Sequence, residues 1–223
     1  MNKTSNSSIF IWTGGALVIV IAVLIIVKMA LPSSSSTNPN QAMGKIAGGI
    51  TNADQVRGNK ESKVVLVEYS DYACPACAAN EVTVNKLVND YRDKVAFVYR
   101  HFPLPYHIHS KEAAYATEAA ARQGKFWDLG DLLFSKQSEW AESTDFPTLL
   151  SGYVKTIGLD EVKLKTDMQD SAIKAKVDAD VASADAAGLN HTPTYYLNGA
   201  EIPNPDTYEE FKQILDNALK TAS

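Results

Sequence analysis

The chain has 223 residues, 45% of them hydrophobic, and a formal net charge of −5. This length and composition can bury one sizeable core but not two large ones, so we expect one folded domain with an appendage. No long basic run supplies the phosphate-neutralising surface that nucleic-acid binding needs, so a nucleic-acid partner is excluded.

The first 60 residues divide into three expected parts: a short tail at residues 1–8, an anchor at 9–27 and a tether at 28–60. The anchor segment is apolar apart from Thr13, Gly14 and Gly15, and it is long enough to cross a hydrocarbon core as a single transmembrane helix. Lys28 follows where a cleaved signal peptide needs small residues, so we expect an uncleaved signal-anchor. The tether is rich in Ser, Asn, Gly and Pro and cannot bury enough apolar surface to fold alone.

Residues 61–105 read as a strand–helix–strand unit. The run 64–69 is almost continuously apolar, which is typical of a strand covered on both faces. A helical pattern begins at Pro75, a residue that a first turn tolerates well, and a second strand follows at 95–99. The side of this helix expected to face the core carries Ala78, Val82, Leu87, Val88 and Tyr91.

Residues 106–190 are helical in character, and residues 191–223 return to strands and one last helix. Breaks in the helical block fall at Gly124, Pro147, Gly158 and Gly188. Strands are expected at 194–197 and 200–202, joined by a tight turn at Asn198 and Gly199. Asp206 and Glu209 then form a capping box for an amphipathic C-terminal helix.

The only two cysteines are Cys74 and Cys77, with Pro75 and Ala76 between them. A disulfide within the chain must therefore close a ring too short to stabilise the fold much, so redox chemistry is the better reason to keep it. Cys74 lies at a helix N-terminus, where unpaired amides and the helix dipole favour a thiolate, so it is expected to attack substrates. Cys77 lies one turn into the helix and is expected to be the less exposed, resolving thiol.

A zinc site is the competing interpretation of two cysteines at this spacing. It would need two further ligands, and the chain has only four histidines: His101, His107, His109 and His191. In a zinc knuckle a tight turn usually follows the second cysteine, whereas here the chain continues from Cys77 directly into a helix. We therefore expect no metal and no cofactor, and the histidines are expected to be loop and surface residues.

Four segments resemble the DsbA-type branch of the thioredoxin superfamily. They are residues 67–77, which end in Cys74-Pro75-Ala76-Cys77, then 99–104, 124–127 and 192–195, and the resemblance covers about 60–218. The fold that it implies is a thioredoxin α/β fold with an inserted helical domain. The activity that it implies is thiol–disulfide exchange, with oxidation of thiols in exported proteins.

The resemblance also implies roles for three further residues. Thr192 and Pro193 are expected to form a cis peptide facing the cysteines, with the backbone of Thr192 binding an extended substrate. Glu68 stands where thioredoxin-like proteins keep a buried acid beneath the resolving cysteine, and burial would raise its pKa and let it accept the proton of Cys77. The alternative places Glu68 at an exposed strand end.

The chain departs from the strongest oxidants of this family at two positions near the active site. The strongest oxidants carry a histidine at the position of Ala76, so this chain lacks one cationic group that would stabilise the thiolate. His191, just before the Thr-Pro pair, either replaces that histidine beside Cys74 or faces solvent. Interpolation between thioredoxin and DsbA then predicts a Cys74 pKa of about 4.5 to 6 and a potential of about −130 to −200 mV.

Three functions remain open on the sequence. The first is a monomeric, membrane-anchored dithiol oxidase outside the cytoplasm, acting on reduced exported proteins and recharged by a quinone-linked membrane oxidase. The second is a reductase or isomerase of the same fold, although an isomerase normally has a dimerisation domain that residues 32–60 do not supply. The third is a non-catalytic binding or chaperone module that keeps the fold.

Overall fold

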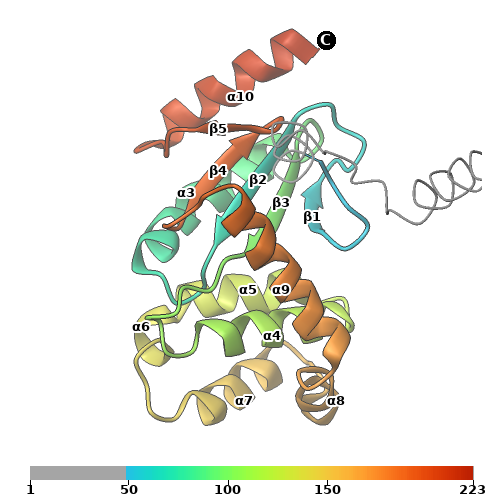
Figure 1. The fold of residues 1–223 in the computed structure, drawn as a ribbon, viewed down its shortest axis with the longest axis vertical. Coiled ribbons are helices and arrows are strands. Elements are labelled where there is room, and N and C mark those ends of the chain that lie inside the picture. The colour runs from blue at the N-terminus through green and yellow to red at the C-terminus, as the bar shows by residue number, and fades with distance from the viewer. Residues whose placement is uncertain (1–48, 223) are drawn as a thin grey trace, which may run out of the picture. The chain divides into compact units, whose positions relative to one another are not determined.

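The computed structural model describes residues 49–222, and their centre is a five-stranded mixed sheet (Figure 1). Its strand order is β1-β3-β2-β4-β5, in which β2 and β3 run parallel and the other neighbours run antiparallel. The strands are β1 (Gln55–Gly58), β2 (Val65–Ser70), β3 (Ala96–His101), β4 (Thr194–Leu197) and β5 (Ala200–Ile202).

The helices lie between and after these strands in the order expected from the sequence. One helix, α3 (Pro75–Tyr91), connects β2 to β3, and α10 (Tyr208–Ala222) ends the described chain. Between β3 and β4 lie α4 (Ser110–Ala121), α5 (Phe126–Ser135), α6 (Gln137–Trp140), α7 (Phe146–Thr156), α8 (Glu161–Asp167) and α9 (Ser171–Ala186). Gly188 has a φ of 77° two residues after the end of α9, just past the C-cap Ala187, as its expected capping role requires.

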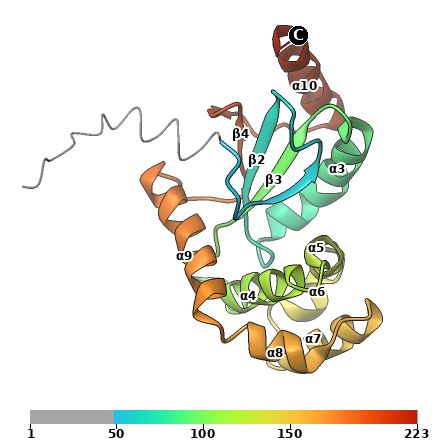
Figure 2. The same ribbon diagram turned by 90° about the vertical axis from the view of Figure 1, so that its right-hand side faces the viewer.

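The two faces of the sheet are covered by different helices (Figure 2). Side chains alternate along β2, so that Leu66 joins the apolar core with α3 and α10, while Val67 joins the core with α9. Glu68 follows with the side-chain direction of Leu66 and therefore faces α3. Because of this alternation, the carboxyl group of Glu68 lies on the same side of the sheet as the two cysteines.

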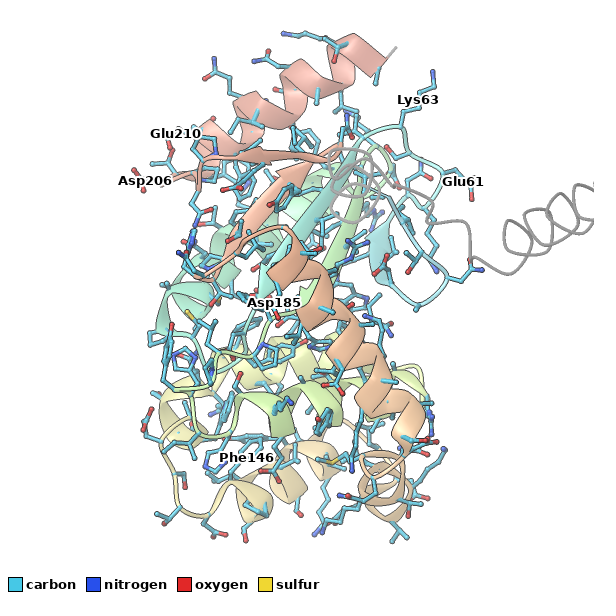
Figure 3. All side chains as sticks on the ribbon, in the orientation of Figure 1. Glu61, Lys63, Phe146, Asp185, Asp206 and Glu210 are labelled. Carbon is cyan, nitrogen blue, oxygen red and sulfur yellow. The ribbon has the colours of Figure 1, made fainter. Side chains whose placement is uncertain are left out.

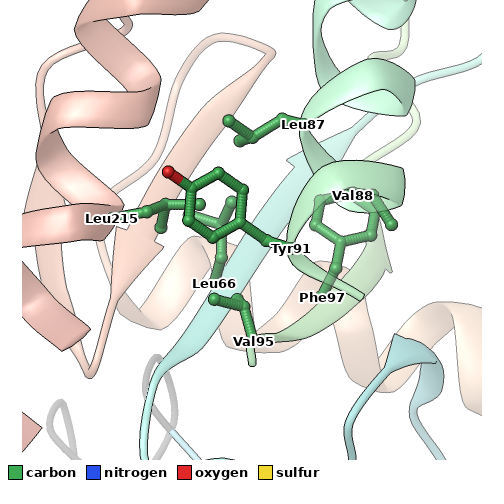
Figure 4. Close-up of a pocket in the computed structure, with 7 residues that line it drawn as sticks. All are labelled: Leu66, Leu87, Val88, Tyr91, Val95, Phe97 and Leu215. Atoms are coloured by element: carbon green, nitrogen blue, oxygen red, sulfur yellow. The ribbon is translucent and has the colours of Figure 1, made fainter. Parts of the chain in front are cut away.

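The contact between α3, α10 and the sheet is closely packed (Figure 4). Leu66, Tyr91, Phe97 and Leu215 are among the side chains that meet there, around a cavity of only about 10 Å³. That volume is at the lower limit for one water molecule. The packing fixes the position of α3 on the sheet, and with it the position of the cysteines.

The inserted helices α4 to α8 have an apolar core of their own, which reaches the start of α3. Phe146 and Trp140 are fully buried in it, with ring centroids 4.8 Å apart, and Figure 3 places Phe146 within this layer. Cys74, Cys77 and Tyr72 belong to the same cluster. The segment that carries the two cysteines is therefore buried against the insertion as well as against the sheet.

The structure corrects the expected tether at 28–60. Residues Gln55–Gly58 form the edge strand β1, and Arg57 makes an ion pair of 2.9 Å with Asp131 of α5. The apolar content of this segment is low, and its order comes from pairing with β3 and from this charge pair. The rest of the expected tether before Gly49 lies outside the described residues.

Two local expectations also need correction. Val82 is 79% exposed, and Val84 takes the expected buried place on α3. The cap of α10 is displaced by one residue: the Thr207 hydroxyl accepts from the N–H of Glu210, whose carboxylate accepts from the N–H of Asp206. Figure 3 shows Asp206 and Glu210 side by side at this helix start.

Within residues 49–222, no helix combines the length and the apolar character needed to cross a membrane. The segment expected to be the anchor, residues 9–27, lies outside the described residues.

Candidate active site

Cys74 occupies the N-cap position of α3, and Pro75 follows in its first turn, as expected. The two cysteines are present as free thiols, 6% exposed for Cys74 and 1% for Cys77, while Pro75 and Ala76 are exposed. Cys74 is more buried than its terminal position suggests, but it remains the more accessible of the two.

The local hydrogen bonds stabilise a thiolate at Cys74. Its pKa is lowered from 9.0 to about 5, chiefly by a hydrogen bond from the Cys77 thiol, with further help from the side chain of Thr192 and the backbone amides of Cys77 and Ala76, while burial acts against this shift. The value lies within the range expected from the sequence. Burial raises the pKa of Cys77 well above its usual range, and so does donation to Cys74. The pair is therefore set up as one thiolate and one thiol.

The loop before β4 lies against Cys74. The Thr192–Pro193 peptide is cis, which confirms the expectation, and both residues are buried. The carbonyl oxygen of Thr192 is 3.5 Å from the Cys74 sulfur. Asn204, which the sequence did not single out, donates to the Pro193 carbonyl oxygen at 2.7 Å.

His191 is exposed, and its Nδ1 lies 3.1 Å from the side-chain oxygen of Asn190. It faces solvent, the second of the two positions considered from the sequence, and it is not among the groups that lower the Cys74 pKa. The thiolate is therefore stabilised by neutral donors instead of a cation.

Glu68 is buried, 1% exposed, on the face of β2 that α3 covers. Burial is the main cause that raises its pKa to about 7, against lowering interactions with Ser70 and Tyr195. One carboxylate oxygen, the Ser70 hydroxyl and the Tyr195 hydroxyl are buried without a hydrogen-bond partner in the described residues. A carboxyl group that titrates near neutrality beneath Cys77 can both give and accept a proton.

A second carboxyl group, Glu81, lies one turn after Cys77 on α3, and the sequence analysis missed it. Its pKa is raised to about 9, first by burial and then by the charges of Glu68 and Asp131. Its Oε1 accepts from Asn85 at 2.7 Å, and the Asn85 side-chain oxygen accepts from Arg57 at 2.6 Å. The four-residue spacing to Cys77 was the available signal, because it places both side chains on one helix face.

The turn before Cys74 is organised around Asp71, whose side chain is fully buried. Its carboxylate accepts from the N–H of Ala73 and the hydroxyl of Ser110 through one oxygen, and from the N–H of Leu104 through the other. The Nδ1 of His107 lies 2.7 Å from that second oxygen. The position of Asp71, three residues before Cys74, was a weak indication in the sequence that its side chain accepts the hydrogen bonds of this turn, because Asp side chains often bind nearby backbone N–H groups in turns.

The histidines do not gather into one site. His101 is buried and lies 3.0 Å from Glu118, so the expectation that all four are loop and surface residues is wrong for this one. His109 lies 2.6 Å from the Ser143 carbonyl oxygen. Within residues 49–222, no group of three or more His, Cys, Asp or Glu side chains has the geometry to hold a metal ion.

Comparisons with known proteins agree with this geometry. Residues 51–217 match the thioredoxin family model. The chain is 35% identical over 170 residues to a protein named Na(+)/H(+) antiporter NhaA 3 from Salinispora tropica, covering 76% of this chain and 25% of that protein. The chain thus spans about a quarter of the length of the curated relatives it matches, and the activity in their names is not carried over to it.

Two solved structures extend the comparison. BdbD from Bacillus subtilis is 27% identical with a TM-score of 0.68, over 78% of this chain and 97% of that one. A thioredoxin-like oxidoreductase from Silicibacter pomeroyi is 28% identical with a TM-score of 0.66, over 80% of this chain and 96% of that one. With Cys74 and Cys77 at the start of α3, the chain belongs to the thioredoxin family and carries its cysteine pair as thioredoxin-like oxidoreductases do.

Proposed function

We propose that this protein is a dithiol oxidase that introduces disulfides into reduced exported proteins. The observation that carries the proposal is the stabilised Cys74 thiolate, whose pKa is lowered to about 5. A thiol–disulfide protein oxidises its partners when its own reduced form is the favoured one. The hydrogen bonds to the Cys74 thiolate stabilise the reduced form. They do not stabilise the disulfide form, because it contains no thiolate.

Oxidation of a substrate dithiol proceeds in two exchanges. A substrate thiolate attacks the Cys74 sulfur of the oxidised protein, forming a mixed disulfide and breaking the bond to Cys77, which leaves as a thiolate and takes a proton from Glu68. The second substrate thiolate then attacks the substrate sulfur of the mixed disulfide. The substrate disulfide forms, Cys74 leaves as its stabilised thiolate, and two electrons have passed to the protein.

Recharging runs the same exchanges in the opposite direction with a membrane partner of the quinone-linked oxidase class. The Cys74 thiolate attacks a disulfide of the partner, Cys77 gives its proton to Glu68, and the Cys77 sulfur attacks Cys74 to release the partner's second thiol. The pKa of Glu68, about 7, suits both directions, because neither protonation state dominates near neutrality.

Thr192 is the proposed contact for the substrate backbone. Within the described residues, no backbone hydrogen bond engages Thr192, and its carbonyl oxygen lies beside the Cys74 sulfur. An extended peptide with its sulfur at Cys74 can therefore pair with this loop in the manner of an added strand. Such pairing reads the backbone and not the side chains, which fits a protein with many substrates.

We place the domain outside the cytoplasm, held by residues 9–27 with the N-terminus inside, and acting as a monomer. Disulfides form and persist mainly in oxidising compartments of this kind. The relative from Salinispora tropica is named as an ion antiporter, and this chain matches only 25% of it. A related segment thus occurs within a membrane protein, in keeping with attachment to a membrane here.

The test is the equilibrium of the protein with glutathione buffers of known potential. A potential of about −130 to −200 mV, between those of DsbA and thioredoxin, supports the oxidase. A value below about −240 mV, in the thioredoxin range, rejects it in favour of a reductase. Turnover of a reduced test protein with a thiol oxidant present excludes the non-catalytic binding or chaperone alternative, and scrambled test proteins distinguish an isomerase.

A further inference from the structure

The carbonyl groups on either side of Ala73 are held by one side chain from the inserted helices. The Nε2 of Gln137, the first residue of α6, donates to the carbonyl oxygens of Tyr72 and Cys74, each at 2.8 Å. Both carbonyls belong to the turn that carries the Cys74 sulfur. The contact spans more than sixty residues of sequence.

Gln137 is itself held in place by the core of the insertion. Trp140, at the other end of this short helix, is fully buried and donates its indole N–H to the Leu133 carbonyl oxygen at 2.8 Å. Half-buried Gln137 therefore projects from a fixed support toward the catalytic turn. Its amide is positioned before the turn meets any substrate.

The two carbonyls depend on Gln137 to different degrees. The Cys74 carbonyl oxygen also accepts from the N–H of Ala78, the first hydrogen bond of α3. For the Tyr72 carbonyl oxygen, Gln137 is the only donor among the described residues. Loss of the glutamine amide would leave that oxygen without a partner, so the turn would shift to reach water.

We propose that Gln137 is a positioning residue for the redox reaction: it fixes the turn that carries the Cys74 sulfur and thereby sets how strongly the thiolate is stabilised. Two physical effects act together. The amide hydrogens offset the partial negative charge of two carbonyl oxygens in the turn that carries the thiolate. The fixed turn also keeps the Cys74 sulfur aligned with the Cys77 thiol and with Thr192.

The inference rests on Cys74 being the thiolate that faces substrate, and it holds for either direction of electron flow. It gives the helical insertion a part in the chemistry that the thioredoxin fold alone does not supply. If Cys74 were not the substrate-facing thiol, the trapping experiment described below would fail while the effect of Gln137 on the thiolate remained. The two ideas therefore fail separately.

The test replaces Gln137 in the full-length protein and measures the Cys74 thiolate. Gln137→Met keeps the length of the side chain and removes both donors, and Gln137→Ala removes the side chain. The ultraviolet absorbance of the thiolate against pH reports Cys74 alone below neutrality, since the pKa of Cys77 is raised. We expect the acidity constant to fall about three- to tenfold, the range that one lost hydrogen bond supports.

The equilibrium with glutathione should also shift: the disulfide form should be favoured about threefold or more in Gln137→Met compared with the wild type. Gln123→Ala is the matched control, because Gln123 also donates to a backbone carbonyl oxygen, that of Asp160, far along the insertion. An acidity constant within about twofold of the wild type in folded Gln137→Met, even with a lower melting temperature, would show a purely structural bond and overturn the proposal. An equal shift in the control would overturn it as well.

Discussion

The carbonyl oxygen of Thr192 lies 3.5 Å from the sulfur of Cys74, although 118 positions separate the two residues. The contact brings together the N-terminus of α3 and the loop that opens β4. The Cys74 sulfur thus lies against a residue, Thr192, that makes no backbone–backbone hydrogen bond within the described chain.

Replacing one cysteine at a time should separate the two thiols. Cys77→Ala should accumulate mixed disulfides with exported proteins, because Cys74 is the more accessible sulfur and nothing remains to resolve the adduct. Cys74→Ala should accumulate none. Non-reducing gels after acid quenching measure both, and comparable trapping by the two variants would reject the assignment of Cys74.

Glu68→Gln should change stability in a pH-dependent way. The folded pKa of about 7 lies above the ordinary value of 4.5, so the stability of the wild type is complete below about pH 4.5 and falls as the pH rises through about 7. The variant has no such loss and should gain up to about 3 kcal/mol over the wild type at alkaline pH, and nothing in acid. Urea unfolding at several pH values measures this.

The same variant should slow resolution of mixed disulfides by about 100-fold, the usual scale for loss of a general acid or base. Glu61→Gln is the control, since Glu61 is exposed on the loop before β2 (Figure 3). If Glu68→Gln resolves mixed disulfides as fast as the control at every pH, Glu68 does not transfer the proton.

The reduced protein should lose stability relative to the oxidised protein in acid. The Cys74 pKa is depressed, so the thiolate's contribution is complete above an unfolded pKa of about 9 and disappears as the pH falls through about 5. Between about pH 7 and about pH 4 the reduced form should lose about 3 kcal/mol relative to the disulfide form. Cys74→Ser cannot form the disulfide, so its unfolding free energy is compared with that of the oxidised wild type at each pH, and this difference should no longer change between about pH 7 and about pH 4. A change that persists in the variant would assign the dependence to another group.

Truncation should show where the domain begins. A fragment that starts at Gly48 keeps β1 and should be soluble, monomeric and active on a peptide substrate, since it lacks the apolar segment 9–27 and the tether removed with that segment carries no apolar pattern suited to docking on the core. A fragment that starts at Glu61 loses β1 and the ion pair of Arg57 with Asp131, and it leaves the edge of β3 open to aggregation. Equal solubility and activity of the two fragments would show that β1 is dispensable.

The sequence was informative wherever the signal is local. The apolar run of β2, the helix start at Pro75, the turn at Asn198 and Gly199 and the residue after α9 all appear where the pattern predicts them. β1 was missed because an edge strand buries little apolar surface. Val82 was misplaced because the buried stripe of α3 through Leu87 and Val88 includes Val84, which lies on the opposite side of the helix from Val82. His101 was misread because its burial comes from Glu118 on another helix.

By itself, the sequence determined that two cysteines must act as a pair, that the first begins a helix, and that an acid lies on the strand before them. These features depend on spacing, capping and periodicity over a few residues. Only the tertiary structure decided that neutral donors stabilise the thiolate and that Gln137 holds the turn before α3. It also decided that Glu81 is buried close to Glu68, so that burial and then the charge of Glu68 raise the pKa of Glu81. Burial and hydrogen bonding set these properties, and both depend on groups brought together from distant parts of the chain.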